Sequence, residues 1–355
     1  NMVLNAYTRQ KRRDGAVENA ERILSELEKI YRTTGNTSLQ PDVVSYTSLV
    51  SAWARSNRKG YGARRAEAIV KRMEAFAVES GNPSIRPNSI TYNVVLKAWC
   101  RSGDSDAVEN AERILSKLEE IYLSTGDRTL QPDVVSYTTL VTAWTNSHRK
   151  AYGARRAEDI VKRMETFARE SGNSSVRPNT VTYNTVLNAW CRSGDSDAPK
   201  RSLAIFRAMQ KGSIAGNRFI APDIITFNTL VRTLVKDGTV ESAQLAEDIL
   251  VEMECSENGA GMLYCSPDLW VYNSVIEGWS RLPDSVGAEK AYLVLLRLIQ
   301  REKKDIIPDA FSFNTVLFAL IKNNDIHSAE RVEGLLRYMD NKSIKPHPFN
   351  PNLRP

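Results

Sequence analysis

The sequence lacks the features that membrane proteins and most enzymes require. It contains no run of 18 apolar residues, so we expect no transmembrane helix. It also contains no Gly-rich phosphate loop and no HxE motif combined with PCxxC. With only three histidines and no clustered carboxylates outside helical surfaces, it offers no recognisable catalytic centre. We therefore expect a protein that is not an enzyme and needs no cofactor.

Cysteines are few and form no CxxC motif. Cys100 and Cys191 occupy equivalent places, each followed by the string RSGDSDA, and they are expected to be small core residues in a reducing compartment. Cys255 and Cys265 flank an irregular stretch, where a disulfide or a metal site stays open as an alternative although no histidine lies nearby.

Charge gives a mild indication of the partner. The chain has 48 basic and 42 acidic residues, for a formal net charge of +6. This surplus favours an anionic partner, but many proteins with neutral partners show it too.

An internal repeat organises the chain. PDVVSYTSLVSAW, which begins at Pro41, returns as PDVVSYTTLVTAW at Pro132, an offset of 91 residues, and each 91-residue block consists of two similar halves. Pro followed by Asp or Asn marks each half. The resulting repeats span residues 1–42 (truncated), 43–88, 89–133, 134–179, 180–223, 224–268, 269–309 and 310–347, followed by a tail at 348–355.

The repeat contains two amphipathic helical patterns. Positions 4, 7, 8 and 11 of the first pattern are apolar, as in Tyr46, Leu49, Val50 and Trp53, and position 10 is small in every complete repeat. The second pattern follows the same logic at Ala66, Ile69, Val70, Met73 and Phe76, or Ile23, Leu24, Leu27, Ile30 and Tyr31. Polar segments such as RSGDSDA and NRKGYG are expected to be the turns between them. Stacked hairpins of this kind predict an all-α fold, a right-handed α-solenoid superhelix of tandem helix-turn-helix repeats with a long concave face.

The repeat resembles the pentatricopeptide repeat (PPR) family. In VTYNTVLNAWCRSGDSDAPKRSLAIFRAMQ, from Val181, the resemblance lies in the aromatic residue and Asn at positions 4 and 5, the Cys followed by a basic residue, the Gly turn, the later AxxxF and Met, and a closing PD. Repeats of that family run about 35 residues, whereas these are longer, with the excess expected in the turn between helices and around the end of the second helix. Asn1 falls inside a repeat, so we expect the natural amino terminus, with any targeting peptide, to lie outside this sequence.

The resemblance implies that three positions of each repeat meet one nucleotide of single-stranded RNA. Position 2 packs against the base, while position 5 and the last residue read its edge. Positions 5 and 13 lie within about 60° and about 20° of position 2 around the helix. Position 2 carries Val44, Ile90, Val135, Val181, Ile225, Trp270 and Phe311. The alternative is that these residues pack between helices, as the five position 11 tryptophans should (Trp53, Trp99, Trp144, Trp190 and Trp279).

Position 5 and the last residue of the repeat combine in few ways. The pairs are Asn1/Asp42, Thr47/Asn88, Asn93/Asp133, Thr138/Asn179, Asn184/Asp223, Asn228/Asp268, Asn273/Asp309 and Asn314/His347. The Asp or Asn could instead cap the next helix. A carboxylate accepts from the ring N–H of U or G, whereas an amide donates to the ring nitrogen of A or C. The resemblance adds that Thr at position 5 goes with purines and Asn with pyrimidines. The pairs then read UAUAUUU, and the last pair has no assignment.

Position 13 is basic in seven of eight repeats, and Asn146 is the exception. The basic residues are Arg9, Arg55, Arg101, Arg192, Lys236, Arg281 and Lys322. They are expected to follow RNA phosphates, although a cation at a helix carboxyl end is also stabilised by the helix dipole. Arg64, Arg65, Arg155 and Arg156, which begin second helices, are expected on solvated faces.

The function that the resemblance implies is sequence-specific binding of single-stranded RNA, one base per repeat, near 5′-UAUAUUU-3′. It also implies a role in stabilisation, processing or translation of transcripts in a mitochondrion or plastid, together with other RNA-processing proteins. The competing hypothesis is a scaffold similar to tetratricopeptide arrays that captures a peptide on the concave face. Any catalysis would belong to appended nuclease or deaminase domains outside this sequence.

Overall fold

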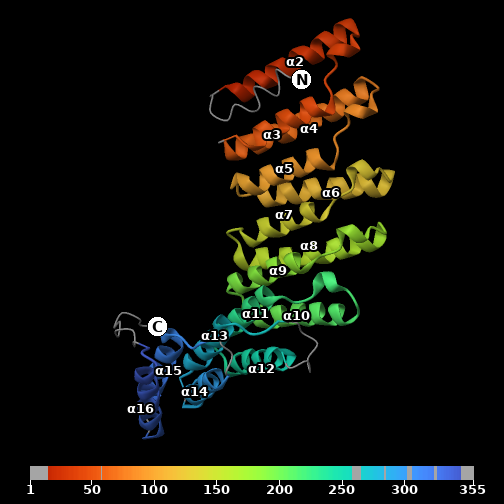
Figure 1. Ribbon diagram of the computed structural model, residues 1–355. Helices are drawn as coiled ribbons and strands as arrows, with labels where there is room; N and C mark the ends of the chain where they lie inside the picture. The colour runs from red at the N-terminus through yellow and green to blue at the C-terminus, as the bar shows by residue number, and fades with distance from the viewer. Residues whose placement is uncertain are drawn as a thin grey trace. The chain divides into compact units, whose positions relative to one another are not determined.

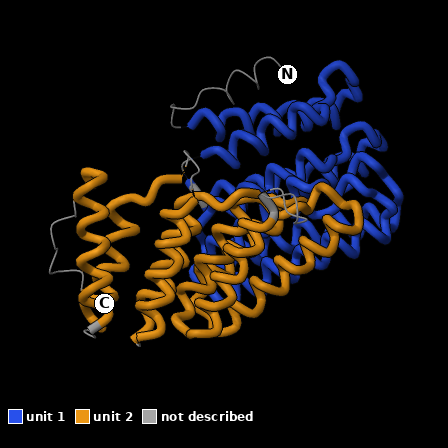
Figure 2. Tube along the Cα trace, turned by 60° about the horizontal axis from the view of Figure 1, so that its bottom comes forward, with its two compact units in different colours: residues 1–178 blue, residues 179–355 orange. Residues whose placement is uncertain are grey.

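The computed structural model describes residues 15–56, 58–257, 265–283, 285–301, 306–323 and 326–344. This part of the chain consists of α-helices joined by short turns, several of them 3-10 helical, and contains no strand (Figure 1). The chain divides into two compact units, residues 1–178 and residues 179–355 (Figure 2).

The first unit is a stack of helical hairpins. Its helices are α2 (Ala16–Thr34), α3 (Val43–Ala54), α4 (Lys59–Glu79), α5 (Ser89–Ser102), α6 (Ala107–Thr125), α7 (Val134–Thr145) and α8 (Lys150–Glu170). The 3-10 turns η1 (Thr37–Leu39), η2 (Pro83–Ile85), η3 (Arg128–Leu130) and η4 (Ser174–Val176) follow the longer helices. Helices α3, α5 and α7 pack against one another in a row, and α4 and α6 each contact the row on both sides (Figure 1).

The second unit is built in the same way. Its helices are α9 (Thr180–Ser193), α10 (Ala198–Ile214), α11 (Ile224–Asp237), α12 (Val240–Glu257), α13 (Leu269–Ser280), α14 (Ser285–Gln300), α15 (Ala310–Asn323) and α16 (Ile326–Asn341), with η5 (Arg218–Ile220) after α10. Helices α9, α11, α13 and α15 form the row, and α10, α12 and α14 each contact two of its members. The predicted fold class, an all-α solenoid of tandem helical hairpins, is confirmed within each unit.

The buried stripe of the first helices lies where the sequence predicts it. Tyr46, Leu49, Val50 and Trp53 are buried, and so are the other four position 11 tryptophans. The small residue at position 10 faces the neighbouring first helix. A Cβ on Gly278 would lie 2.9 Å from Cγ2 of Val235, so α11 and α13 approach closely at that point.

One predicted turn is wrong. The segment NRKGYG was expected to join two helices, but α4 already begins at Lys59. Gly62 lets α4 lie close to the end of α3, since a Cβ at Gly62 would lie 2.5 Å from the carbonyl oxygen of Trp53. The excess length of the repeats therefore lies in second helices of up to 21 residues and the 3-10 turns after them, and the turns between the helices of a hairpin stay short.

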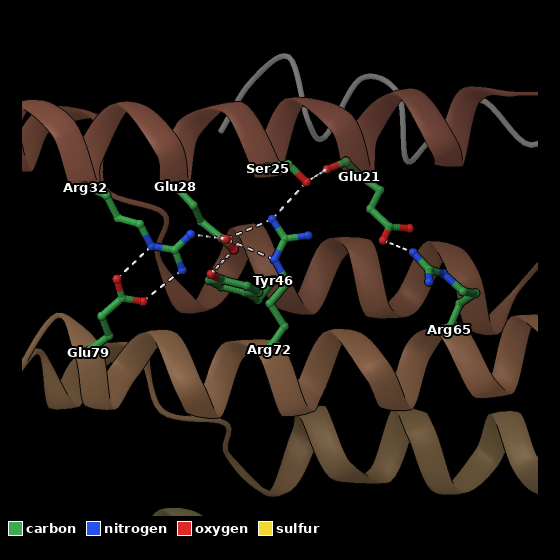
Figure 3. A network of polar contacts seen from close by, with 8 residues as sticks. All are labelled: Glu21, Ser25, Glu28, Arg32, Tyr46, Arg65, Arg72 and Glu79. Atoms are coloured by element: carbon green, nitrogen blue, oxygen red, sulfur yellow. Dashed lines mark hydrogen bonds and ion pairs between the residues drawn. The ribbon is translucent and has the colours of Figure 1, made fainter.

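Buried glutamates join consecutive repeats (Figure 3). The Tyr46 hydroxyl donates to Glu28 at 2.5 Å, and Trp53 Nε1 donates to Glu21 at 2.9 Å. Arg72 of the next second helix binds Glu28 at 2.8 Å, and Arg65 binds Glu21. Burial raises the pKa of Tyr46, and the hydrogen bond to Glu28 raises it further, so the tyrosine stays a neutral donor. Each pair of glutamates thus holds the aromatic residues of one helix and the cations of another.

The same network recurs in three other repeats whose positions 4 and 11 are Tyr and Trp. Glu67 and Glu74 accept from Trp99 and Tyr92, Glu112 and Glu119 from Trp144 and Tyr137, and Glu247 and Glu254 from Trp279 and Tyr272. Where positions 4 and 11 are Phe227 and Leu234 instead, the places 18 and 32 residues earlier hold Met209 and Ser202. The glutamates are therefore present where Tyr and Trp supply hydrogen-bond donors, and absent where Phe227 and Leu234 supply none.

Two sequence interpretations are corrected by this network. Arg65 and Arg156 were expected on a solvated face, but they bind Glu21 and Glu112 and lie 5.8 Å and 5.9 Å from the ring centres of Trp53 and Trp144. In α2, Ile30 was expected in the apolar stripe but is exposed, and Glu28 is buried one turn from Leu24 instead. Glu28 is buried because Tyr46 and Arg72 both donate hydrogen bonds to its carboxylate.

Glu67 makes stability depend on pH. Burial opposes its charge, but hydrogen bonds from Arg113, Lys71 and Trp99 outweigh it and lower the pKa of Glu67 below its ordinary value of 4.5. A carboxyl with a lowered folded-state pKa stabilises the fold above its unfolded-state pKa and loses that contribution as pH falls through the folded-state pKa. The difference in unfolding free energy between the parent and Glu67→Gln should therefore be constant above pH 4.5 and shrink below it. Chemical denaturation between pH 3 and pH 7 measures it, and a difference that does not change with pH would contradict the network.

The structure also bears on membrane insertion and on the cysteines. No helix in the described part of the chain is long and apolar enough to cross a membrane. Cys191 is buried and Cys100 half-buried, and burial raises the pKa of the Cys100 thiol to about 12. Among the described residues there is no cluster of three metal-ligating side chains, and Cys255 and Cys265 are free thiols.

Candidate nucleic-acid interface

The position 2 side chains form an exposed apolar series on the first helices. All seven are exposed, from 41% for Trp270 to 66% for Val181. The alternative interpretation, that they pack between helices, is wrong, because a packed residue at this place would be buried like the position 11 tryptophans. An apolar group of this kind offers a surface against which a planar base can pack.

The last residue of each repeat caps the next helix. Oδ1 of the Asp or Asn accepts the backbone N–H of the third helical residue, at 2.8 Å for Asp42 and Ser45 and at 3.0 Å for Asn88 and Thr91. Asp133, Asn179, Asp223, Asp268 and Asp309 cap their helices in the same way. The capping role is real, and it fixes where the rest of each side chain lies.

Four predicted Asn and Asp pairs are brought together in the structure. Nδ2 of the position 5 Asn donates to the carboxylate at 2.9 Å in Asn184/Asp223 and at 3.3 Å in Asn273/Asp309. The corresponding distances are 3.3 Å in Asn93/Asp133 and 3.4 Å in Asn228/Asp268. Residues about 40 positions apart in sequence therefore share one small polar site next to the exposed position 2 side chains.

The carboxylate of Asp309 remains an acceptor at neutral pH. Burial opposes its ionisation, but the backbone N–H and hydroxyl of Ser312 and the amide of Asn273 all donate to it. These donors lower the pKa of Asp309 below its ordinary range, so the group offers lone pairs to a ring N–H.

The Asn side chains that close Thr repeats present the opposite chemistry. Oδ1 of Asn88 accepts both the backbone N–H and the hydroxyl of Thr91, each at 3.0 Å. Because the oxygen is held by the helix start, Nδ2 is the end of the amide left for other partners, and it is a donor. Thr47 Oγ1 lies 3.1 Å from Thr91 Oγ1, so the predicted pair Thr47/Asn88 is joined through a third side chain. Asn179 is held in the same way by Thr182, and Thr138 donates to the carbonyl of Val134.

The sequence interpretation did not single out that third side chain, which lies at position 3 of the repeat. Position 3 carries Ser45, Thr91, Ser136, Thr182, Thr226, Val271 and Ser312, so six of seven complete repeats have a hydroxyl there. The recurrence of a hydroxyl at position 3 was visible in the sequence, but it was treated as part of a short stretch of apolar and Thr or Ser residues. Its contacts with position 5 became evident only in the structure.

The described position 13 cations are all exposed and lie at or near the carboxyl ends of the first helices. Arg55 donates to the carbonyl of Ser51 at 3.2 Å, and Arg281 pairs with Glu277 at 2.5 Å on its own helix. Lys236 donates to the carbonyl of Cys191 at 3.1 Å. These contacts fit a helix-end role as well as phosphate binding, so binding of phosphate by these residues stays a prediction.

Three predicted site residues, Asn1, Arg9 and His347, lie outside the described residues. Asn314, whose expected partner is His347, is half-buried on α15.

Fold and site together define a helical-repeat protein of stacked hairpins that present one small polar site and one apolar side chain per repeat. The sequence matches pentatricopeptide repeats in three stretches: residues 29–102 match the pentatricopeptide repeat domain, and residues 90–118 and 174–198 each match a PPR repeat. These stretches of the chain are pentatricopeptide repeats. Proteins of the pentatricopeptide repeat family are in general RNA-binding helical-repeat proteins without enzymatic activity.

One solved structure is similar along most of the chain. The crystal structure of the pentatricopeptide repeat protein PPR10 from maize is 18% identical, with a TM-score of 0.41, over 97% of this chain and 44% of that chain. This chain thus spans less than half the length of that protein. No curated protein matches the sequence.

Proposed function

We propose that this chain binds single-stranded RNA sequence-specifically, one base per repeat, at a site close to 5′-UAUAUUU-3′. Each base would pack against an exposed position 2 side chain while position 5 and the last residue contact its edge. The role we propose is stabilisation, processing or translation of a transcript in a mitochondrion or plastid.

The observation that carries this proposal is the coincidence of two features in five complete repeats, 43–88, 89–133, 180–223, 224–268 and 269–309. An apolar side chain that should be buried is exposed, and beside it a polar pair of fixed hydrogen-bonding character is held by a helix cap. A stacking surface with a donor or acceptor at its edge is what an unpaired base requires. The last residue accepts a hydrogen bond in the Asn/Asp pairs and donates one in the Thr/Asn pairs, which supports the distinction between U and A.

A comparison of strand states tests this function. The labelled RNA 5′-UAUAUUU-3′ embedded in a longer unstructured strand should bind the chain, and the same strand annealed to its complement should bind far more weakly. Pairing hides the Watson–Crick edges and stacks both base faces, so neither the polar pairs nor position 2 can reach them. Fluorescence anisotropy measures both affinities. Equal binding of the two forms would contradict base reading.

The position 13 cations predict a salt dependence. The logarithm of the binding constant should fall with the logarithm of salt concentration by about 0.7 per neutralised phosphate. Replacing Arg55, Arg101 and Arg192 together with Ala should flatten this slope and leave the base preference unchanged. The matched control replaces Arg22, Arg169 and Arg207, three exposed arginines of second helices, with Ala, which removes the same charge. Equal slopes for the two triple variants would assign position 13 to helix-end stabilisation alone.

A further inference from the structure

The amide of position 5 has two chemically opposite ends, and the structure holds it in one orientation in three of the four Asn and Asp pairs. Ser136 Oγ donates to Asn93 Oδ1 at 2.6 Å, and Ser312 Oγ donates to Asn273 Oδ1 at 2.6 Å. Thr226 Oγ1 donates to Asn184 Oδ1 at 2.7 Å. In each case the hydroxyl belongs to position 3 of the following repeat.

The fourth pair lacks this hydroxyl. Position 3 after the pair Asn228/Asp268 is Val271, which is fully buried and whose backbone N–H donates to the capping Asp268. Oδ1 of Asn228 is buried and has no hydrogen-bond partner among the described residues. Its Nδ2 contact with Asp268 is long, at 3.4 Å. This amide is therefore oriented by a single weak contact.

A hydroxyl carries one hydrogen and can satisfy one acceptor at a time. In all three pairs its distance to the Asn oxygen is shorter than its distance to the carboxylate, which is 2.8 Å for Asp133 and Asp309 and 2.9 Å for Asp223. With Oδ1 engaged in this way, Nδ2 points to the carboxylate, and its second hydrogen is left for a ligand. Turning the amide over would place its oxygen against the carboxylate and its NH₂ against the hydroxyl.

We propose that the position 3 hydroxyl is a positioning group that sets how strictly each uracil repeat rejects cytosine. This inference rests on the proposed function and extends it to a residue outside the base-contacting set. The fixed amide donates to a carbonyl of uracil next to the ring N–H that the carboxylate accepts. Cytosine presents an amine where uracil has its O4 carbonyl, and a fixed donor meets that amine unfavourably. An amide that is free to turn accepts from the amine instead.

The parent protein already provides a test, because its three last assigned bases are all uracil. Pairs Asn184/Asp223, Asn228/Asp268 and Asn273/Asp309 would read the fifth, sixth and seventh bases. Three RNAs, each with cytosine at one of these places in UAUAUUU, compete against the parent sequence. Cytosine at the sixth place should cost about fivefold less affinity than at the fifth or seventh, the factor that one ordinary hydrogen bond gives.

Variants then move the tolerance from one repeat to another. Val271→Thr replaces a methyl group with a hydroxyl of nearly equal volume opposite the unpartnered Asn228 oxygen. It should raise the discrimination of uracil from cytosine at the sixth base about fivefold. It should also raise the melting temperature, because a buried acceptor gains a donor. Ser312→Ala and Thr226→Val should each lower discrimination by a similar factor at the seventh and fifth base, respectively. Thr226→Ser keeps the hydroxyl and should retain the parent's discrimination.

The outcomes separate this inference from the function on which it rests. If the chain binds none of the RNAs, the proposed function fails and the inference fails with it. If UAUAUUU binds tightly but the cytosine penalty is the same at all three places and does not change in Val271→Thr, the positioning role is wrong and the base code stands. Ser312→Ala could instead lower the affinity for every RNA and leave the ratio of the affinities for the uracil and cytosine RNAs unchanged. Position 3 would then have a structural role alone, and the proposal would be overturned.

Discussion

The double variant Asn88→Asp, Asn179→Asp should change the preferred RNA from UAUAUUU to UGUGUUU. In both repeats the amide oxygen is consumed by the helix cap, so the NH₂ group is what remains for a base. Adenine presents a ring acceptor, which that NH₂ group can satisfy. Asp keeps the cap but replaces the donor with an acceptor, and guanine supplies the matching ring N–H. Each mismatch should cost on the order of 1–3 kcal/mol, as an unsatisfied buried polar group does.

The control must add the same two negative charges. Asn82→Asp with Asn173→Asp provides it, because these residues cap the 3-10 turns η2 and η4 through the same kind of bond and lie outside the base-reading positions. Both double variants should lose overall affinity, since two negative charges are added. Only the first should reverse the order of the two RNAs in competition binding. An unchanged order would mean that Asn88 and Asn179 are caps and nothing more.

Removing one buried glutamate should destabilise the fold by about 2–4 kcal/mol, near the cost of leaving a buried partner unpaired. Glu67 is the best choice, because it accepts Trp99 Nε1 at 2.9 Å and Arg113 at 2.8 Å while almost fully buried. Glu67→Ser leaves the Trp99 N–H without its acceptor. Denaturation with urea measures the change in midpoint.

The chain itself supplies the compensating variant. In two other consecutive repeats, Ser202 and Leu234 occupy the places of Glu67 and Trp99. Trp99→Leu with Glu67→Ser therefore copies a combination that this protein already uses. The double variant should cost less than the sum of the two single variants by about 1 kcal/mol or more, since the two residues are in contact. Additive costs would show that the acid and the tryptophan stabilise the fold independently.

The sequence was sufficient for the helices, their register and the location of the polar sites. Periodicity placed Tyr46 and Trp53 in the core, and a helix begins at Val43, Ser89 and Val134, where the repeat predicts one. The pairing of Asn93 with Asp133 followed from the resemblance to the pentatricopeptide repeat family, which implies that position 5 and the last residue of a repeat meet the same base.

What the sequence left hidden involves polar groups whose partners lie in other repeats. Glu21 and Glu28 resemble ordinary surface charges of an amphipathic helix, and only the constant spacing of 18 residues to Tyr46 and of 32 residues to Trp53 could have indicated their burial. Val44 was ambiguous, since an apolar residue at a helix start is usually packed. Position 3 was hidden because its hydroxyl acts across a repeat boundary.

Two RNAs of identical length and composition test the central claim most directly. The chain should bind 5′-UAUAUUU-3′ more tightly than its reversal, 5′-UUUAUAU-3′, in the same flanking sequence. The reversal places uracil at the repeat that carries Thr47/Asn88 and adenine at the repeat that carries Asn228/Asp268. A preference of at least tenfold for the first RNA is expected, since two mismatches of about 1–3 kcal/mol each are introduced, at the second and sixth places. Equal affinity for both RNAs would contradict base reading by these repeats.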